Sequence, residues 1–284
     1  MSEPLASLRL CVSAVQSYTL VRSGHPRISP MRRLTDPAAS ILIALLAWEA
    51  AVRLFHVSPR LLPPPSEVAA SITEHLGLLL EHALPTTIET FAGFGLATAA
   101  GFALGIMLFS SSLAQAATMP WILAAQIVPK IALAPLFVVW LGVGAPCRLA
   151  FAVFIAFFPV LIATVAGLSA TDRAALALCR GLGAARWQTM LLVRLPFAVP
   201  HLLAGLKTAA TLALLGIVIG EFVTAQRGLG YLVLLAGNID ETALMLAAIT
   251  LLLAVGAALY GTVLALEAAF ARWYATPMTA GEFG

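Results

Sequence analysis

Long apolar runs recur along most of this chain, and they constrain its fold more than any other feature. Each run has roughly 20 residues, which matches the hydrocarbon core of a bilayer at about 1.5 Å of helix rise per residue. The chain has 284 residues, of which 61% are hydrophobic and only 10% are charged, whereas a soluble domain carries about 25% charged residues. The sequence therefore predicts an all-α, polytopic membrane protein of about six transmembrane helices.

The apolar runs define the expected spans, which are 38–55, 86–109, 113–141, 147–168, 200–224 and 241–270. The segment 58–85 between the first two spans is rich in proline and glutamate, so we expect an external loop there. A short helix is expected to start at Ser66, because a serine that follows prolines and precedes a glutamate is a helix-start signal. No segment repeats at a fixed period, which argues against a fold built from internal repeats.

Arginines lie mainly on one side of the predicted membrane. Five precede the first span and four lie in 169–199, while the opposite segments hold Arg60, Arg148 and Arg227, with Arg53 near their edge. The positive-inside rule then puts the N-terminus, the 169–199 segment and the C-terminus in the cytoplasm. Both Met1 and Met31 remain open as translation starts.

Several function classes lack their signature in this sequence. The net charge of +3 is spread over short segments without a dense basic patch, so no nucleic-acid partner is expected. The three cysteines are far apart and indicate neither a disulfide framework nor a metal site. Neither lysine ends a GxxxxGK[ST] motif, so the chain is not expected to bind ATP, and no hydrolase motif supports an enzyme.

The segment 169–199 differs from its surroundings because it carries four arginines and still keeps a helical period. One apolar stripe is formed by Leu176, Cys179, Gly183, Trp187 and Met190. Asp172 is placed to cap a helix, and Gly183 interrupts the stripe with a dent or a turn. Physics alone leaves two interpretations open, a cytoplasmic helix or helix pair that meets a partner and a membrane-surface helix whose arginines face anionic lipid.

The spacing around Gly183 resembles the "EAA" loop of ABC importer permeases, whose pattern is Glu-Ala-Ala, three positions, Gly, nine positions and Ile-x-Leu-Pro. Gly183 is followed after nine positions by Val193-Arg194-Leu195-Pro196. The wider series of motifs is similar to permeases of the aliphatic sulfonate, taurine and nitrate type and to their pyrimidine-precursor and riboflavin relatives. It comprises LLPPPSEV at 61–68, Gly93-Phe94, VPKIALAPLFVVWLGVG at 128–144, FFPV at 157–160, and Glu221 with Gly228-Leu229-Gly230.

The resemblance implies a type I ABC importer permease in a bacterial inner membrane, with a permease domain over 36–272 between cytoplasmic segments 1–35 and 273–284. It also implies a dimer of ATPase subunits that carry ATP and magnesium, an external solute-binding protein, a second copy of this chain and surrounding lipid. No cofactor is expected on this chain. The solute would be of the sulfonate, nitrate, pyrimidine or flavin type.

In such permeases the loop, here 169–199, carries a coupling helix that sits in a cleft of the ATPase. The residues that carry over are Leu182, Gly183, Ala184, Arg186, Trp187, Leu195 and Pro196, the last two being expected to stop the segment before the fifth span. Ala177-Leu178-Cys179 replaces the family's Glu-Ala-Ala, so the contacts of that glutamate do not carry over.

Charged residues inside spans are functional hypotheses, because each costs about 2.5–3.5 kcal/mol at membrane depth. Lys130 lies between Pro129 and Pro135, where it either faces an anionic solute or neutralises carbonyls freed at a helix break. Glu89 and Glu221 are expected as its partners or as gate residues, and Glu49 with Arg53 as an ion pair on one helix face.

Small residues at i, i+4 spacing predict close helix packing, either within one subunit or at a subunit interface. They are Ala97, Gly101 and Gly105 in the second span and Gly216 and Gly220 in the fifth.

Two rival functions remain, an ion-coupled secondary transporter and a membrane enzyme. The first would need more acidic residues inside spans together with an internal repeat, and the second a polar catalytic constellation at one membrane face.

Overall fold

The computed structural model describes the backbone of residues 32–224 and 226–275 and the side chains of 39–224 and 226–270. Every regular element in this part of the chain is helical, which confirms the all-α prediction. In order these are α2 (Arg32–Leu54), α3 (Pro65–Glu74), α4 (Leu76–Phe109), α5 (Ser112–Ile127), the 3-10 helix η1 (Lys130–Leu133), α6 (Ala134–Leu141), α7 (Ala145–Ser169), α8 (Arg173–Gly181), α9 (Arg186–Thr189), the π-helix η2 (Met190–Arg194), α10 (Leu195–Thr224), α11 (Leu229–Asn238) and α12 (Thr242–Ala275). The predicted N-terminal segment up to residue 31 and the tail from 276 lie outside the described residues.

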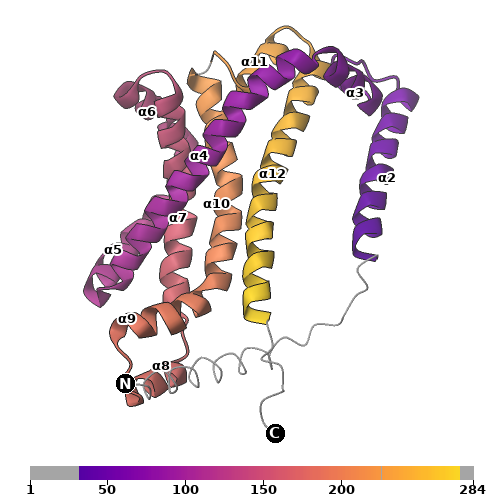
Figure 1. Ribbon diagram of the computed structural model, residues 1–284. Helices are drawn as coiled ribbons and strands as arrows, with labels where there is room; N and C mark the ends of the chain where they lie inside the picture. The colour runs from indigo at the N-terminus through magenta and orange to yellow at the C-terminus, as the bar shows by residue number, and fades with distance from the viewer. Residues whose placement is uncertain (1–31, 225, 276–284) are drawn as a thin grey trace.

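Four helical segments of the described chain are long and apolar enough to cross a membrane, or five if one bent pair counts as a span. The four are α4, α7, the continuous run Arg186–Thr224 and Thr242–Phe270, and the bent pair is Ser112–Ile127 with Lys130–Leu141. These correspond to five of the six expected spans. Helix α2 occupies the place of the remaining one, and Figure 1 shows it standing apart from the bundle, joined to it through α3.

Helices α4, α7 and α10 pack most closely, and glycines permit their contact. A Cβ atom at Gly101 would lie 2.8 Å from the Cβ of Val160, and one at Gly105 would lie 2.6 Å from the Cβ of Thr164. On α10, a Cβ atom at Gly216 would lie 2.6 Å from the Cα of Ala152. The small residues predicted from i, i+4 spacing therefore serve packing against α7 within one subunit.

Replacing Gly105 by alanine is expected to destabilise the bundle by about 1–3 kcal/mol, because the added methyl group forces α4 and α7 apart. Gly95 on the same helix is a matched control, since a Cβ atom there meets nothing within 4 Å, and alanine in its place is expected to be neutral or to stabilise by up to about 1 kcal/mol. Thermal unfolding midpoints in detergent measure both changes. Equal shifts for the two variants would contradict this packing.

The predicted external loop ends earlier than expected. Helix α3 begins at Pro65, one residue before the expected start, and proline is favoured at this first helical position. Helix α4 then begins at Leu76 and runs through Pro85, so the expected loop does not extend to residue 85. The helix continues past the proline, which transmembrane helices tolerate when neighbouring groups satisfy the freed backbone carbonyl.

The expected third span, 113–141, is broken rather than straight. Helix α5 ends at Ile127, Val128 and Pro129 are extended, and the two helical parts are bent by 89°. The cause is local, because Pro129 lacks an N–H donor and disfavours helical geometry at the residue before it.

The expected stop at Leu195-Pro196 does not occur. The chain stays helical from Arg186 to Thr224 and passes through the π-turn at η2 immediately before Pro196. A π-turn changes the hydrogen-bond pattern at the point where the proline would otherwise leave an i→i−4 bond unmade, so the helix continues.

Candidate functional site

The loop between α7 and α10 forms a compact turn at one end of the bundle (Figure 1). Helix α8 starts at the predicted cap, where the Asp172 carboxylate accepts from the amide of Ala174 at 3.1 Å. The chain then reverses at Gly183, whose φ of +71° is readily adopted only by glycine. The amides of Gly183 and Ala184 donate to the carbonyls of Arg180 and Cys179 at 3.1 and 3.0 Å, which closes the end of α8. The predicted turn at Gly183 is confirmed.

This reversal divides the predicted apolar stripe into two parts. Cys179 is buried with Ala175 and Val193, so α8 packs back on the beginning of the α10 segment. Trp187, by contrast, is 64% exposed. The expectation of one continuous apolar face from Leu176 to Met190 was therefore wrong, because Gly183 turns the chain between its halves.

The predicted loop residues separate into two groups. Leu182, Gly183, Ala184, Arg186 and Trp187 lie together at the turn, where Leu182 is 46% exposed beside the exposed Trp187. Leu195 and Pro196 lie apart from them at the start of α10, where they line an apolar hollow of about 410 Å³ with Thr98 and Phe102 of α4. The turn thus presents large apolar side chains outward, as a docking surface does.

Arg194 connects this loop to the membrane helices, a role that the sequence did not reveal. Its guanidinium donates to the Leu168 carbonyl at the end of α7 at 3.2 Å. The same group lies over the Phe109 ring at the end of α4, 4.8 Å from the ring centroid. Arg194 of η2 therefore contacts the ends of both α4 and α7.

A buried polar network lies at the opposite end of the bundle. Glu221 of α10 is 1% exposed, and its carboxylate accepts from the Thr86 hydroxyl at 2.6 Å and from the Gly230 amide at 2.7 Å. The Thr86 hydroxyl in turn accepts from the Leu229 amide at 2.8 Å, and the Gly228 amide donates to His82 Nδ1 at 3.1 Å. The network ties α4 and α10 to the turn that precedes α11.

The glycines of this turn make room for the carboxylate. Gly228 has a φ of +123°, and a Cβ atom there would lie 2.1 Å from a Glu221 oxygen. The Glu…Gly-Leu-Gly series thus has a structural reason, because a backbone that donates to a buried carboxylate must approach it closely.

Glu89 forms a two-pronged ion pair with Arg148 of α7. The guanidinium Nε and Nη2 donate to the two carboxylate oxygens at 2.7 and 2.5 Å. Arg148 was expected on the outward side of the membrane, and it lies in the first turn of α7 with its side chain only 11% exposed. Of the two roles expected for Glu89 and Glu221, partnership with Lys130 was wrong, because Arg148 and the Thr86 network hold them; a role as gate residues stays a prediction.

Lys130 instead serves the helix break. Its Nζ donates to the Gln126 carbonyl in the last turn of α5 at 3.1 Å and lies 5.7 Å from the centroid of the Phe158 ring. Of the two interpretations that the sequence left open, this geometry supports the neutralisation of a freed carbonyl.

The predicted Glu49–Arg53 pair is confirmed at 2.5 Å. Glu49 also accepts from the Ser66 amide, which joins α2 to α3.

A second ion pair inside the bundle was missed from the sequence. Lys207 of α10 and Glu267 of α12 lie 2.7 Å apart, with side chains 26% and 41% exposed. The two residues are far apart in the chain, so no local pattern joins them. The available signal was the presence of a basic residue in one apolar span and an acidic residue in another, which is uncommon unless the residues pair or serve function.

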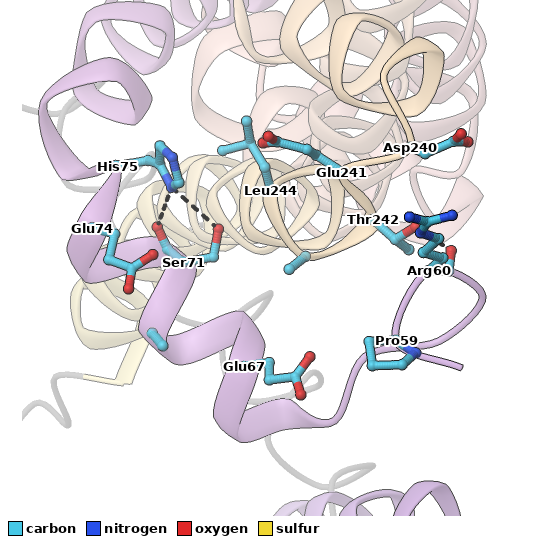
Figure 2. Close-up of a pocket in the computed structure, with 12 residues that line it drawn as sticks. Pro59, Arg60, Glu67, Ser71, Glu74, His75, Asp240, Glu241, Thr242 and Leu244 are labelled. Atoms are coloured by element: carbon cyan, nitrogen blue, oxygen red, sulfur yellow. Dashed lines mark hydrogen bonds between the residues drawn. The ribbon is translucent and has the colours of Figure 1, made fainter. Parts of the chain in front are cut away.

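The α3 side of the molecule carries a polar hollow of about 420 Å³ between α3 and the start of α12. Figure 2 shows Glu67 and Glu74 on one wall and Asp240 and Glu241 on the other, with His75 bonded to Ser71. Arg60 lies at its rim, where its carbonyl accepts from the Thr242 hydroxyl. Among the described residues, no group of three His, Cys, Asp or Glu side chains is arranged to hold a metal ion.

Comparisons with known proteins agree with this architecture. Residues 78–272 match the family described as binding-protein-dependent transport system inner membrane component. The riboflavin transport system permease protein RibX of Chloroflexus aurantiacus is 34% identical over 88% of this chain and 96% of its own length. The formylaminopyrimidine transport permease protein ThiX of Halalkalibacterium halodurans is 32% identical over 69% of this chain and 78% of its own.

A solved structure of the MetNI methionine ABC transporter in an inward-facing conformation superimposes with a TM-score of 0.59. The match covers 69% of this chain and 98% of that chain at 20% sequence identity. At this identity the likeness shows a common fold.

Proposed function

The chain belongs to the family of binding-protein-dependent transport system inner membrane components. We propose that its cytoplasmic loop, residues 169–199, is the element through which ATP hydrolysis drives the membrane helices. The chain is a multi-pass inner-membrane permease of an ABC importer for small solutes. ATP is hydrolysed by a separate subunit, and the permease works with that ATPase and with a solute-binding protein.

The exposed apolar turn carries the coupling proposal. Leu182 and Trp187 present large apolar surfaces beside the Gly183 turn, and exposed aromatic residues of this kind are typical anchors of protein interfaces. Arg194 supports the transmission step, because it contacts the ends of both α4 and α7. Ala184 and Arg186 complete the surface at the turn, while Leu195 and Pro196 would carry its motion into α10.

The remaining architecture follows once the loop between α7 and α10 is placed in the cytoplasm. With the loop in the cytoplasm, both termini are cytoplasmic, the permease domain spans 36–272, and the hollow beside α3 faces the external binding protein. The ATPase would form a dimer, and the pathway would be shared with a second copy of this chain, each copy embedded in lipid. We assign Glu89 and Glu221 to holding the outer end of the bundle and Lys130 to the border of the pathway at the α5–η1 break.

The solute is proposed to be a small heterocycle. Two relatives of more than 30% identity are named for riboflavin and formylaminopyrimidine. Uptake of labelled flavin and pyrimidine by vesicles that contain the complete importer tests this choice. Uptake of a sulfonate or nitrate alone would contradict it.

Docking of the ATPase subunit tests the role of the turn. Leu182→Asp and Trp187→Ala are each expected to weaken co-purification of the ATPase by about 2 kcal/mol or more, which is the loss typical of an interface anchor. Leu61→Asp is the control, because Leu61 is 77% exposed at the opposite end of the bundle. If the loop variants retain the ATPase as fully as Leu61→Asp does, the loop lies on the membrane surface and does not dock.

A further inference from the structure

The apolar hollow beside the start of α10 lies between three helices and reaches into the bundle. Leu195 and Val199, one helical turn apart, belong to its α10 wall, while Phe102 of α4 and Phe270 of α12 belong to the other walls. Figure 1 shows α12 ending near the start of α10. The floor is Val160 of α7, which is only 1% exposed. The volume of about 410 Å³ falls within the range of about 300–1,000 Å³ that is typical of ligand sites.

Water is a poor occupant of this hollow. Thr98 is the one polar side chain among the described residues that line it, and its buried hydroxyl has no hydrogen-bond partner among the described residues. A buried water makes about three hydrogen bonds, so a single hydroxyl does not hold one. An empty apolar space is also unfavourable, because its lining loses dispersion contacts. The hollow therefore fits an apolar occupant.

The depth of the hollow matches one leaflet of a bilayer. On α10 it extends from Leu195 to Leu206, which is about 16 Å at 1.5 Å of rise per residue. On α4 it reaches Thr98, which at the same rise lies about 16 Å from the helix end at Phe109. The hydrocarbon core of a bilayer is about 30 Å thick, so the acyl chains of one leaflet extend over about 15 Å.

The mouth of the hollow is continuous with the surface that the protein presents to lipid. Leu191 and Phe270, which both line the hollow, are 54% and 40% exposed. Leu264 and Leu266 extend this exposed apolar surface along α12. An inner-membrane protein meets the bilayer with such a surface, so an acyl chain enters the hollow without crossing water.

The charge at this end of the bundle suits an anionic headgroup. Arg173, Arg180 and Arg186 are exposed on the loop between α7 and α10. The only acidic residue of the segment 169–199 is Asp172, which caps α8. Basic residues at a membrane surface attract anionic phospholipids.

We propose that the hollow binds one acyl chain of an anionic phospholipid from the leaflet on the side of the α7–α10 loop. The headgroup lies at the level of the loop arginines, and the second acyl chain stays in the surrounding bilayer. The bound acyl chain fills the space between α4, α12 and the segment Leu191–Pro196, so a lipid lies beside the π-turn. The inference requires the membrane location that the family shows, and it does not require the coupling role of the loop.

Photolabelling tests the site. The protein is assembled with its ATPase in nanodiscs that contain a phosphatidylglycerol with a diazirine near the end of one acyl chain. After illumination, mass spectrometry of peptides is expected to find this lipid attached to Thr98 or Leu206 at least about tenfold more often than to Leu253, because burial holds the acyl chain in the hollow. Leu253 is a matched control on α12, where it is 71% exposed outside the hollow.

Filling the hollow supplies the matched variants. Val199→Phe and Leu202→Phe, both in the α10 wall, are each expected to lower attachment at Thr98 and Leu206 by at least about tenfold, since methylenes kept out of the hollow lose their apolar burial. Leu253→Phe makes the same kind of change outside the hollow and is expected to leave attachment unchanged.

Two results would overturn the inference. The first is attachment in the wild-type protein that is no higher at the hollow than at Leu253, as it would be if a second copy covered the hollow; this comparison does not depend on how the filled variants fold. The second is equal attachment in both filled variants and in Leu253→Phe. A phosphatidylcholine with the same diazirine chain is expected to attach about fivefold less, the effect of one basic residue near an anionic headgroup, and equal attachment of the two lipids would overturn the choice of headgroup.

Discussion

Arg148→Leu will destabilise the folded chain by about 3–5 kcal/mol, the loss expected when one partner of a buried ion pair is removed. The cost arises because the Glu89 carboxylate stays buried between α4 and α7 after it loses both of its hydrogen bonds. Reversible unfolding in mixed micelles of detergent and dodecyl sulfate measures the change.

The double variant Arg148→Leu with Glu89→Leu separates the pair from the packing around it. Removing both charges leaves no unpaired carboxylate, and well-packed apolar replacements of a buried pair are often neutral or stabilising. We therefore expect the double variant to recover most of the loss. A double variant as unstable as Arg148→Leu would contradict this explanation.

Glu221→Leu will cost about 1–3 kcal/mol, because it strands the buried Gly230 amide at the outer end of the bundle, whereas the Thr86 hydroxyl can turn to the His82 carbonyl. The Gly230 amide and the Thr86 hydroxyl both donate to this carboxylate. Glu221→Gln will cost far less. Its amide oxygen can accept from the Gly230 amide, and its NH₂ group can donate to the Thr86 hydroxyl oxygen. The Thr86 hydroxyl proton then turns to the His82 carbonyl. The same unfolding measurement compares the two variants.

Equal losses for the leucine and glutamine variants would indicate that side-chain shape, and not hydrogen bonding, holds the turn before α11. Because the network joins α4, α10 and α11, we also expect the leucine variant to increase proteolysis near Gly228.

Periodic and local features of the fold were predictable from the sequence. Apolar length located the membrane helices, Asp172 marked the start of α8, and the Gly183 turn followed from glycine chemistry. These features depend on residues within a few positions of one another, which is the range over which helix periods and caps operate. The Glu49–Arg53 pair was predictable for the same reason.

Features that depend on packing between distant segments were not predictable. Arg148 reaches Glu89 across 59 positions, and Lys207 meets Glu267 between α10 and α12. A single sequence names the charged residues but not their partners, so Glu89 and Glu221 were left as partners of Lys130 or as gate residues. The passage of a continuous helix through Pro196 was also missed, because the π-turn that permits it has no sequence signature in this chain.

The most direct test of coupling is ATP turnover by the chain reconstituted with its ATPase and binding protein in proteoliposomes, compared between wild type and Gly183→Asp. Aspartate at a φ of +71° strains the turn and puts a charge on the docking surface. If the loop couples the ATPase to the membrane helices, the variant will insert and pair with a second copy but lose stimulation by the binding protein. Unchanged docking and unchanged stimulation would contradict this role and leave the loop as a membrane-surface helix.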